Sequence, residues 1–348
     1  MKSGNWSFHP ALDAFDQFRD RWDALNRAQD NHILLDSAFV AILLRHFGSR
    51  DVVLAINEDV GNPALALIER KAPGIWETFQ PSWAPLGLIL YGNGEKARES
   101  LSSLIRSLPG YAVELGVLQQ DPNFSGFSAV DNCGWVEKSD YMQTARIPLE
   151  GTFDEYWASR EDRLRKNNHR LRRRMAEKGL DVSFTMIRDP AGVEDGIREF
   201  GRLESKGWKF NEGTAVGVDD AQGRFYRTVL ENFCEHGEGV IYQLRIDGQV
   251  VATDICAVRD EMAIVIKTTY DEDWKVWAPG VLLREDIVRD LYAGGRVRNY
   301  EFYGPLMDYQ LRWTKDVRTL YHLTCFRHPW VRGARNFARR IRRRASTG

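Results

Sequence analysis

The chain has 348 residues, of which 43% are hydrophobic and 11% aromatic, enough to form one large core or, as we expect, two domains of medium size. Its 48 basic and 49 acidic side chains nearly cancel, which argues against a general electrostatic role in binding nucleic acid. No apolar run reaches the roughly 18 residues that a membrane span needs, and the N-terminus lacks a signal-peptide pattern, so we expect a cytoplasmic protein.

The first half of the chain alternates helices with short strands. Between residues 11 and 47, apolar side chains recur at intervals of three and four, which predicts two amphipathic helices. Apolar and β-branched runs then follow, separated by Gly, Asn and Pro, and these predict strands. The remaining elements expected in this half are strands over 52–56, 64–68, 86–91, 111–118 and 143–149, and a helix over 96–107.

The second half repeats this alternation and adds a meander of three strands. Asp247 and Gly248 form a hairpin signal between the first two strands of that meander. A helix and a last strand then follow in a βαβ order. The expected helices are 153–178, 193–205, 223–236 and 281–293, and the expected strands are 181–187, 240–246, 250–259, 261–269 and 299–303.

This order of elements predicts an α/β (α+β) fold built from two similar units, each a mixed twisted sheet flanked by helices. We expect the first unit over residues 1–150 and the second over 151–326, followed by a basic tail over 327–348. The four cysteines are widely separated and form no CxxC pair, so neither a zinc site nor a disulfide framework is predicted.

The most informative segment runs from strand to loop to helix over residues 262–295. The first turn of a helix exposes unpaired backbone N–H groups, which attract phosphate by hydrogen bonding and through the helix dipole. Pro279 starts a helix without wasting a donor, and Gly280 lets the backbone approach an anion closely. The segment therefore predicts an anion site, and the alternative is an ordinary helix start.

Five segments of the chain resemble, in order, motifs of the CelD/BcsL-like acetyltransferases of the GNAT superfamily, which are related to the FemAB-type double-GNAT proteins. A weaker match lies at Arg45–Gly48. The five segments are Lys166–Arg174 (KNNHRLRRR), Glu204–Lys209 (ESKGWK) with Gly213–Ala215 (GTA), Lys267–Glu272 (KTTYDE), Ala278–Leu283 (APGVLL), and Tyr303–Pro305 (YGP) with Trp313–Thr314 (WT).

The resemblance implies two GNAT-like units and acetyl-CoA, or another acyl-CoA, as co-substrate, with no metal. It places the pyrophosphate on the loop Lys275–Gly280 and the acyl group between splayed strands, Ile264–Thr269 and Asn299–Tyr303. The loop has a single glycine where the general GNAT pattern is RxxGxG. The cofactor-binding candidates are Lys267, Thr268, Lys275, Val276, Trp277, Ala278, Pro279 and Gly280.

Transfer to an amine requires a base, an oxyanion donor and an acid for the departing thiolate. Glu301 and Asp254 are candidate bases, because each is a carboxylate in an apolar strand pattern where burial would raise its pKa. Either could instead be a partnered or outward-facing strand residue. The oxyanion donor is expected to be a backbone N–H near Lys267. Tyr309 is the candidate acid by resemblance, with a packing role as the alternative; next to it, Gln310 stands where the family often has Lys.

The acceptor is expected to bind at the loop between the helices predicted over 193–205 and 223–236, in the second half of the chain. Its candidate residues lie in a polar, glycine-containing stretch, which suits contact with a sugar nucleotide or a polyanionic saccharide. The alternative is a tryptophan that only holds the loop in place. The substrate-binding candidates are Trp208, Lys209, Gly213 and Thr214, together with Tyr270.

Two basic stretches contrast with an otherwise acidic chain. Residues 160–178 carry nine Lys or Arg against three acidic residues, and 327–348 carry eight Arg and none. The first lacks interleaved aromatics, so we expect a solvated helix face or a site for an anionic substrate or cofactor phosphate, and no specific nucleic acid. The second, with Trp330, predicts peripheral contact with an anionic membrane or a disordered tail.

The leading prediction is a GNAT-type N-acyltransferase. It would move an acetyl or longer acyl group from acyl-CoA to an amino group of a small-molecule or saccharide precursor in exopolysaccharide or cell-envelope biosynthesis, an acceptor that the family resemblance alone implies. Two alternatives remain open. One is a FemAB-like aminoacyl transferase acting on a peptidoglycan precursor, and the other is a catalytically silent scaffold of a polysaccharide synthase.

Overall fold

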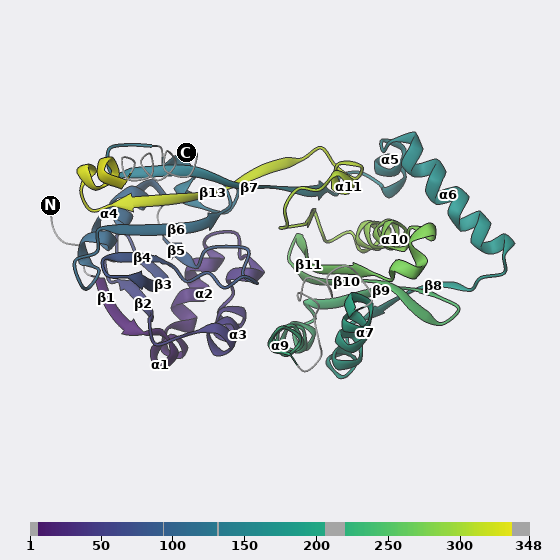
Figure 1. Ribbon diagram of the computed structural model, residues 1–348, viewed down its shortest axis with the longest axis horizontal. Coiled ribbons are helices and arrows are strands. Elements are labelled where there is room, and N and C mark those ends of the chain that lie inside the picture. The colour runs from purple at the N-terminus through teal and green to yellow at the C-terminus, as the bar shows by residue number, and fades with distance from the viewer. Residues whose placement is uncertain (1–5, 93, 131, 206–219, 336–348) are drawn as a thin grey trace, which may run out of the picture. The chain divides into compact units, whose positions relative to one another are not determined.

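The computed structural model describes residues 6–92, 94–130, 132–205 and 220–335, which form two compact units (Figure 1). The described residues of the first unit precede residue 144 or follow residue 317, and the second unit occupies the chain between them. The first unit is therefore made from both ends of the sequence, whereas the pattern of elements predicts boundaries at residues 150 and 326. Within the described ranges, no helix is long and apolar enough to cross a membrane.

The first unit is built on a mixed sheet with the strand order β1-β2-β3-β4-β6-β13, and β5 also pairs with β3. Its pairs are antiparallel except β4 with β6. The strands are β1 (Trp6–Pro10), β2 (Val52–Asn57), β3 (Ala64–Ala72), β4 (Ile75–Thr78), β5 (Ile89–Tyr91), β6 (Glu114–Gln120) and β13 (Val317–Phe326). The helices are α1 (Ala11–Ala14), α2 (Arg19–Arg27), α3 (Ser37–Phe47) and α4 (Ala97–Ser107).

One core of this unit joins α4 to the sheet. Leu101 and Leu104 of α4 pack with Ile68 of β3, and all three side chains are fully buried. Leu323 and Cys325 of β13 belong to the same core. The strand nearest the C-terminus therefore completes a core formed mainly by the first third of the chain.

The second unit is built on a sheet with the strand order β7-β12-β11-β10-β9-β8. The pairs are antiparallel except β11 with β12, which are parallel. The strands are β7 (Val136–Pro148, of which residues 144–148 belong to this unit), β8 (Val182–Ile187), β9 (Gly239–Ile246), β10 (Gln249–Arg259), β11 (Met262–Tyr270) and β12 (Asn299–Glu301). The helices are α5 (Phe153–Ala158), α6 (Asp162–Glu177), α7 (Val193–Ser205), α9 (Ala221–Glu235), α10 (Pro279–Gly294) and α11 (Asp308–Leu311).

Helices cover both faces of this second sheet. Figure 1 shows α10 on one face and α7 with α9 on the other. The apolar face of α10 is buried against the sheet through Leu282, Leu283, Ile287 and Val288. On its outer side α10 packs against α6, where Arg172 donates a 2.7 Å hydrogen bond to Asp286. The first half of α10 is thus held between the sheet and α6.

The feature that positions the candidate site is the divergence of β11 from β12. These strands pair only where Met262–Ile264 runs beside Asn299–Glu301. The next residue, Phe302, donates its N–H to the carbonyl of Ala145 at the β7 end of the sheet, while β11 continues to Tyr270. No strand of the described residues pairs with the free edge of β11 beyond Ile264. An opening between two parallel strands results.

Candidate functional site

A cavity of about 740 Å³ occupies the opening next to the free edge of β11. Its walls are the second half of β11, the start of α10, and the segment from Phe302 to Trp313 that follows β12. Most of the lining is apolar, with a smaller number of polar and charged side chains. A mostly apolar cavity with a few convergent polar groups is typical of a binding site for a small molecule or cofactor.

The start of α10 supplies an anion-binding end to this cavity. Ala278, the N-cap, has φ 48° and ψ 51°, a left-handed conformation that turns the chain sharply into the helix. Pro279 takes the first helical position, where its missing N–H costs nothing. The N–H groups of Val281 and Leu282 bond back to Ala278, whereas Gly280 lies where a helix offers its N–H no intrahelical acceptor. This donor and the helix dipole favour an anion here.

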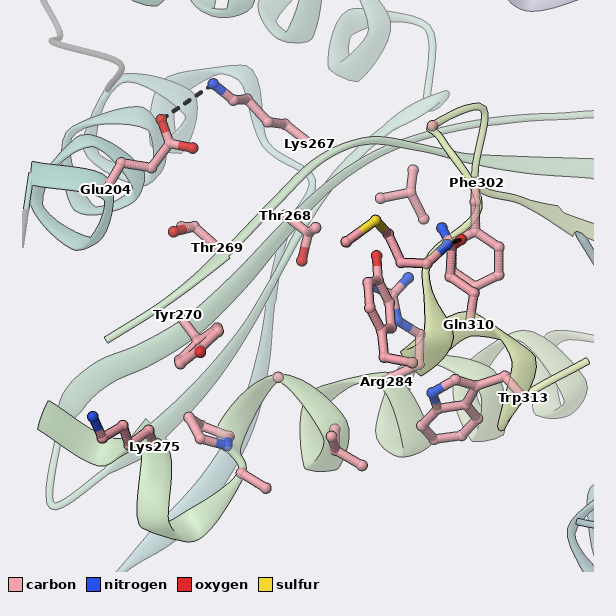
Figure 2. A pocket seen from close by; sticks show the side chains of 18 of the residues that line it. Glu204, Lys267, Thr268, Thr269, Tyr270, Lys275, Arg284, Phe302, Gln310 and Trp313 are labelled. Atoms are coloured by element: carbon pink, nitrogen blue, oxygen red, sulfur yellow. Dashed lines mark hydrogen bonds and ion pairs between the residues drawn. The ribbon is translucent and has the colours of Figure 1, made fainter. Parts of the chain in front are cut away.

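Side chains leave β11 alternately on its two faces (Figure 2). Lys267 points toward Glu204 of α7, and its Nζ lies 3.1 Å from the Glu204 Oε2. The same ammonium lies 5.6 Å from the centre of the Phe200 ring. Thr268 leaves on the α10 side instead, and Tyr270 contacts the start of α10. Thr268 and Tyr270 therefore face the anion-binding end, while the Lys267 ammonium serves the α7 face.

A buried charged network forms the floor of the cavity. Arg284 of α10 places its Nη2 2.9 Å from the Asp254 Oδ2 of β10, and it donates from Nη1 to the Tyr300 hydroxyl at 2.6 Å. The other Asp254 oxygen accepts from the Thr268 hydroxyl, the cross-strand neighbour of Asp254. Burial is the largest single influence and would lower the pKa of Arg284, but the Asp254 carboxylate together with Tyr300, Tyr309 and Cys256 makes the net shift upward. Arg284 therefore stays charged beneath the cavity.

Tyr309 lies on the short helix α11, which lines the cavity together with the start of α10. Its side chain is 38% exposed and lines the cavity. Burial of the hydroxyl raises the pKa of Tyr309 above its ordinary value of 10, and the charge of Arg284 partly opposes that rise. Gln310, beside it, is buried and accepts a 2.8 Å hydrogen bond from the N–H of Met307, which fixes this corner. Tyr309 is thus a neutral hydroxyl in the wall of the cavity.

The structure brings most of the predicted cofactor residues together and separates two of them. Val276 is exposed, and Trp277 lies against α6 with the Arg174 guanidinium 5.1 Å from its ring centre; neither lines the cavity. The predicted residues that line it are Lys267, Thr268, Tyr270, Lys275, Ala278, Pro279, Gly280 and Tyr309. The other substrate candidates, Trp208, Lys209, Gly213 and Thr214, lie outside the described residues.

The two candidate bases differ in position. Asp254 lies below the cavity with its oxygens engaged by Arg284 and Thr268, which is the partnered role given as its alternative. Glu301 is fully buried, is not part of the cavity wall, and lies on the strand face opposite to that of Tyr300. A base role for either one stays a prediction.

Several residues of the site were not predicted from the sequence. Arg284 has the clearest signal, because it shares the helical stripe of Ile287, Val288 and Leu291, where only apolar residues are expected. A cation at such a position indicates a buried partner. Glu204, Phe302 and Trp313 also line the cavity. Glu204 and Trp313 belong to two of the motifs that carry the family resemblance, but no site role was assigned to them, and Phe302 has the pattern of an ordinary core residue.

The second unit is similar to GNAT-type domains in sequence and fold. Residues 162–311, which include α6 through α11, match the family described as acetyltransferase (GNAT) domain. This range contains the diverging strands, the helix start and the cavity between them. The prediction of a GNAT-like α/β fold is therefore confirmed.

Solved structures share this fold along most of the chain. A crystal structure of FemX aligns with a TM-score of 0.57 and 11% identity, covering 90% of this chain and 97% of that one. The C-terminal domain of a candidate lysylphosphatidylglycerol synthetase from Agrobacterium fabrum aligns with a TM-score of 0.56 and 14% identity, covering 89% and 92%. A conserved protein of unknown function from Bacteroides thetaiotaomicron aligns with a TM-score of 0.53, 11% identity and coverage of 92% and 99%. No curated protein matches the sequence significantly.

Proposed function

We propose that this protein is an acyl-CoA-dependent N-acyltransferase of the CelD/BcsL-like kind, acting on an amino group of a saccharide precursor. The observation that carries the proposal is the cavity between β11 and the segment after β12, which ends at the start of α10. A thioester with a long phosphorylated arm matches a mostly apolar cavity that has an anion site at one end.

The chain's own residues supply three of the steps. The pyrophosphate would accept a hydrogen bond from the Gly280 N–H, with Lys275 beside it as a cation. The thioester would lie along the free edge of β11, where a backbone N–H near Lys267 donates to the oxyanion. The amine nitrogen then bonds to the carbonyl carbon, the carbon–sulfur bond breaks, and Tyr309 gives its proton to the thiolate.

The remaining step is removal of the proton from the amine. Glu204 is a buried carboxylate that lines the cavity, on the face where β11 meets α7. It therefore joins Glu301 and Asp254 as a candidate base. Glu204→Gln should lower kcat without weakening acetyl-CoA binding if this carboxylate takes the proton.

Calorimetric titration with acetyl-CoA tests the proposal directly. Glu261→Gln, which removes one member of an exposed ion pair with Arg298 at 3.3 Å, is a control that should bind acetyl-CoA as the unchanged protein does. Gly280→Trp should fill the start of the cavity and abolish binding. Absence of binding to the folded, unchanged protein would overturn acyl-CoA as the donor.

A second candidate is FemAB-like transfer of an aminoacyl group from tRNA to a peptidoglycan precursor. The likeness to FemX favours it, because that likeness extends over 90% of this chain and so includes both units. An assay with aminoacyl-tRNA and acetyl-CoA in parallel separates the two candidates. Turnover with aminoacyl-tRNA but not with acetyl-CoA would replace the first proposal with the second.

A further inference from the structure

A second hollow lies directly beside the cavity, on the α6 side of the start of α10. It has a volume of about 600 Å³ and is lined by one face of α6, by Ala278 and Val281, and by Arg312. Ala278 and Val281 also line the first cavity. The two hollows therefore meet at the start of α10. A ligand long enough to pass that point would have one end in each.

Four cations line this second hollow, which we call the cationic pocket: Arg163, Lys166, Arg170 and Arg312. The first three recur on α6 at intervals of three and four, and so share one face of the helix. Arg312 enters from the end of α11, remote in sequence. The carboxylate in this wall is Glu161, so the pocket has a net positive charge.

Most of the cations in this pocket differ from Arg165, Arg172 and Arg173 of α6 in their partners. Arg165 pairs with Asp162, Arg173 with Glu177 at 3.3 Å and Arg172 with Asp286 at 2.7 Å. Among the described residues, Arg163, Arg170 and Arg312 form no ion pair with a carboxylate, whereas Lys166 is 2.9 Å from Asp162. Two of the three α6 cations in the pocket, Arg163 and Arg170, therefore have no neighbouring carboxylate to neutralise them. Outside the pocket, Arg174 lies 5.1 Å from the centre of the Trp277 ring.

Uncompensated like charges around a concave surface repel one another and attract a counter-charge. Guanidinium groups bind phosphate through two parallel hydrogen bonds, which makes arginine the common residue for a planar, bidentate grip on that anion. The positive end of the α10 dipole adds to the same potential. The preferred ligand group for this pocket is therefore a phosphate with a full charge.

We infer that the cationic pocket binds the terminal phosphate of a nucleotide whose other end carries the reacting group in the first cavity. The inference rests on the proposed function for the choice of ligand, in which this phosphate is the 3′-phosphate on the ribose of an acyl-CoA. It gives α6 a role in binding the acyl donor, in addition to the role of the loop that precedes α10.

The test compares acetyl-CoA with its 3′-dephospho analogue by calorimetric titration. The variant Arg163→Gln/Arg170→Gln removes two charges from the pocket, and Arg173→Gln/Arg198→Gln removes two exposed, paired charges elsewhere as the matched control. We expect the pocket variant to bind acetyl-CoA about tenfold more weakly or worse, and the control to bind it normally. The dephospho analogue should bind both variants and the unchanged protein alike, at a reduced affinity.

The outcomes distinguish this inference from the proposed function. If acetyl-CoA and its dephospho analogue bind the unchanged protein equally, the inference about the cationic pocket is overturned, whereas acyl-CoA remains the proposed donor. If acetyl-CoA does not bind but adenosine 3′,5′-bisphosphate does, and the pocket variant loses that binding, the pocket stands and the donor fails. If the folded protein binds none of the three ligands, both are overturned. Equal weakening of acetyl-CoA and the dephospho analogue by the pocket variant would also overturn the pocket assignment.

Discussion

The surroundings of Tyr309 keep its hydroxyl protonated, as the proposed acid role requires. Burial raises its pKa above 10, and the nearby charge of Arg284 reduces that rise without reversing it. A raised pKa means that the proton is present throughout the neutral range and leaves only as the pH rises past the ordinary value for tyrosine. The acid role that the resemblance implies for Tyr309 stays a prediction, and this protonation state is compatible with it.

The Tyr309→Phe variant should lower kcat by about a hundredfold or more, since a positioned acid contributes 10²- to 10⁴-fold. The ratio of unchanged to variant kcat should be flat between about pH 7 and 9, because the Tyr309 proton remains bound there. Steady-state kinetics with acetyl-CoA at several pH values measures both. Tyr141→Phe, a tyrosine of similar exposure in the first unit, is the control. Unchanged kcat in Tyr309→Phe would assign this side chain to packing.

Individual residues of the site differed in how far the sequence could place them. Pro279 and Gly280 were predictable, because a helix start has local rules that need no tertiary context. Asp254 was predictable as a buried carboxylate, but not its partner, because Arg284 lies on α10, beyond β11 in the chain. An ion pair between two different elements leaves only one local signal in the sequence, which is a charged residue at a position where the pattern expects an apolar one.

At the scale of elements, the Asp254–Arg284 pair joins α10 to β10. Both side chains are almost fully buried, so each charge depends on the other for compensation. The Tyr300 and Thr268 hydroxyls extend the same network to β12 and β11. The start of α10, where we place the pyrophosphate, is therefore held against three strands of the sheet.

Asp254→Asn should reduce the free energy of unfolding by about 3–5 kcal/mol, because it leaves the Arg284 charge buried without a counter-charge. Replacing both residues, Asp254→Leu with Arg284→Met, should cost less than the single change, since no charge is then left buried. Denaturant unfolding of the three proteins measures this order.

Glu261→Gln provides the matched control, since Glu261 and Arg298 form an exposed pair at 3.3 Å. It should change the free energy of unfolding by less than about 1 kcal/mol. Similar losses for Asp254→Asn and Glu261→Gln would show that the buried pair is not the link between α10 and the sheet.

Helices and strands were predicted correctly where the apolar periodicity extends over many residues. The prediction was wrong where a helix break or strand pairing determines the bounds of the element. The expected helix over 153–178 is two helices, because α5 ends at Ala158 and α6 begins at Asp162. The expected strand over 111–118 begins at Glu114, after Tyr111 takes a positive φ of 51°. Strands β1, β4 and β13 were not predicted, since each is short or carries polar residues that obscure its alternation.

At the scale of the whole molecule, the chain enters the first unit, builds the second and returns to the first. Strand β13 pairs with β6 in the register Leu323 to Val117, a contact between residues about 200 positions apart. Sequence periodicity identifies single helices and strands but does not show which strands pair, so it could not place β13 in the first unit. Consequently, residues near the C-terminus stabilise a unit composed mostly of N-terminal residues.

This arrangement predicts which of the two units a core substitution will destabilise. Leu323 and Leu283 are both fully buried, the first in the core of the first unit and the second in that of the second. Truncation of either to Ala should cost about 2–5 kcal/mol. Hydrogen exchange should then show faster exchange in β2–β6 for Leu323→Ala, and in β9–β11 for Leu283→Ala, because each defect lowers the opening free energy of its own core. If either variant accelerates both groups of strands equally, the two units unfold as one and the division of the chain at residues 143 and 318 has no energetic meaning.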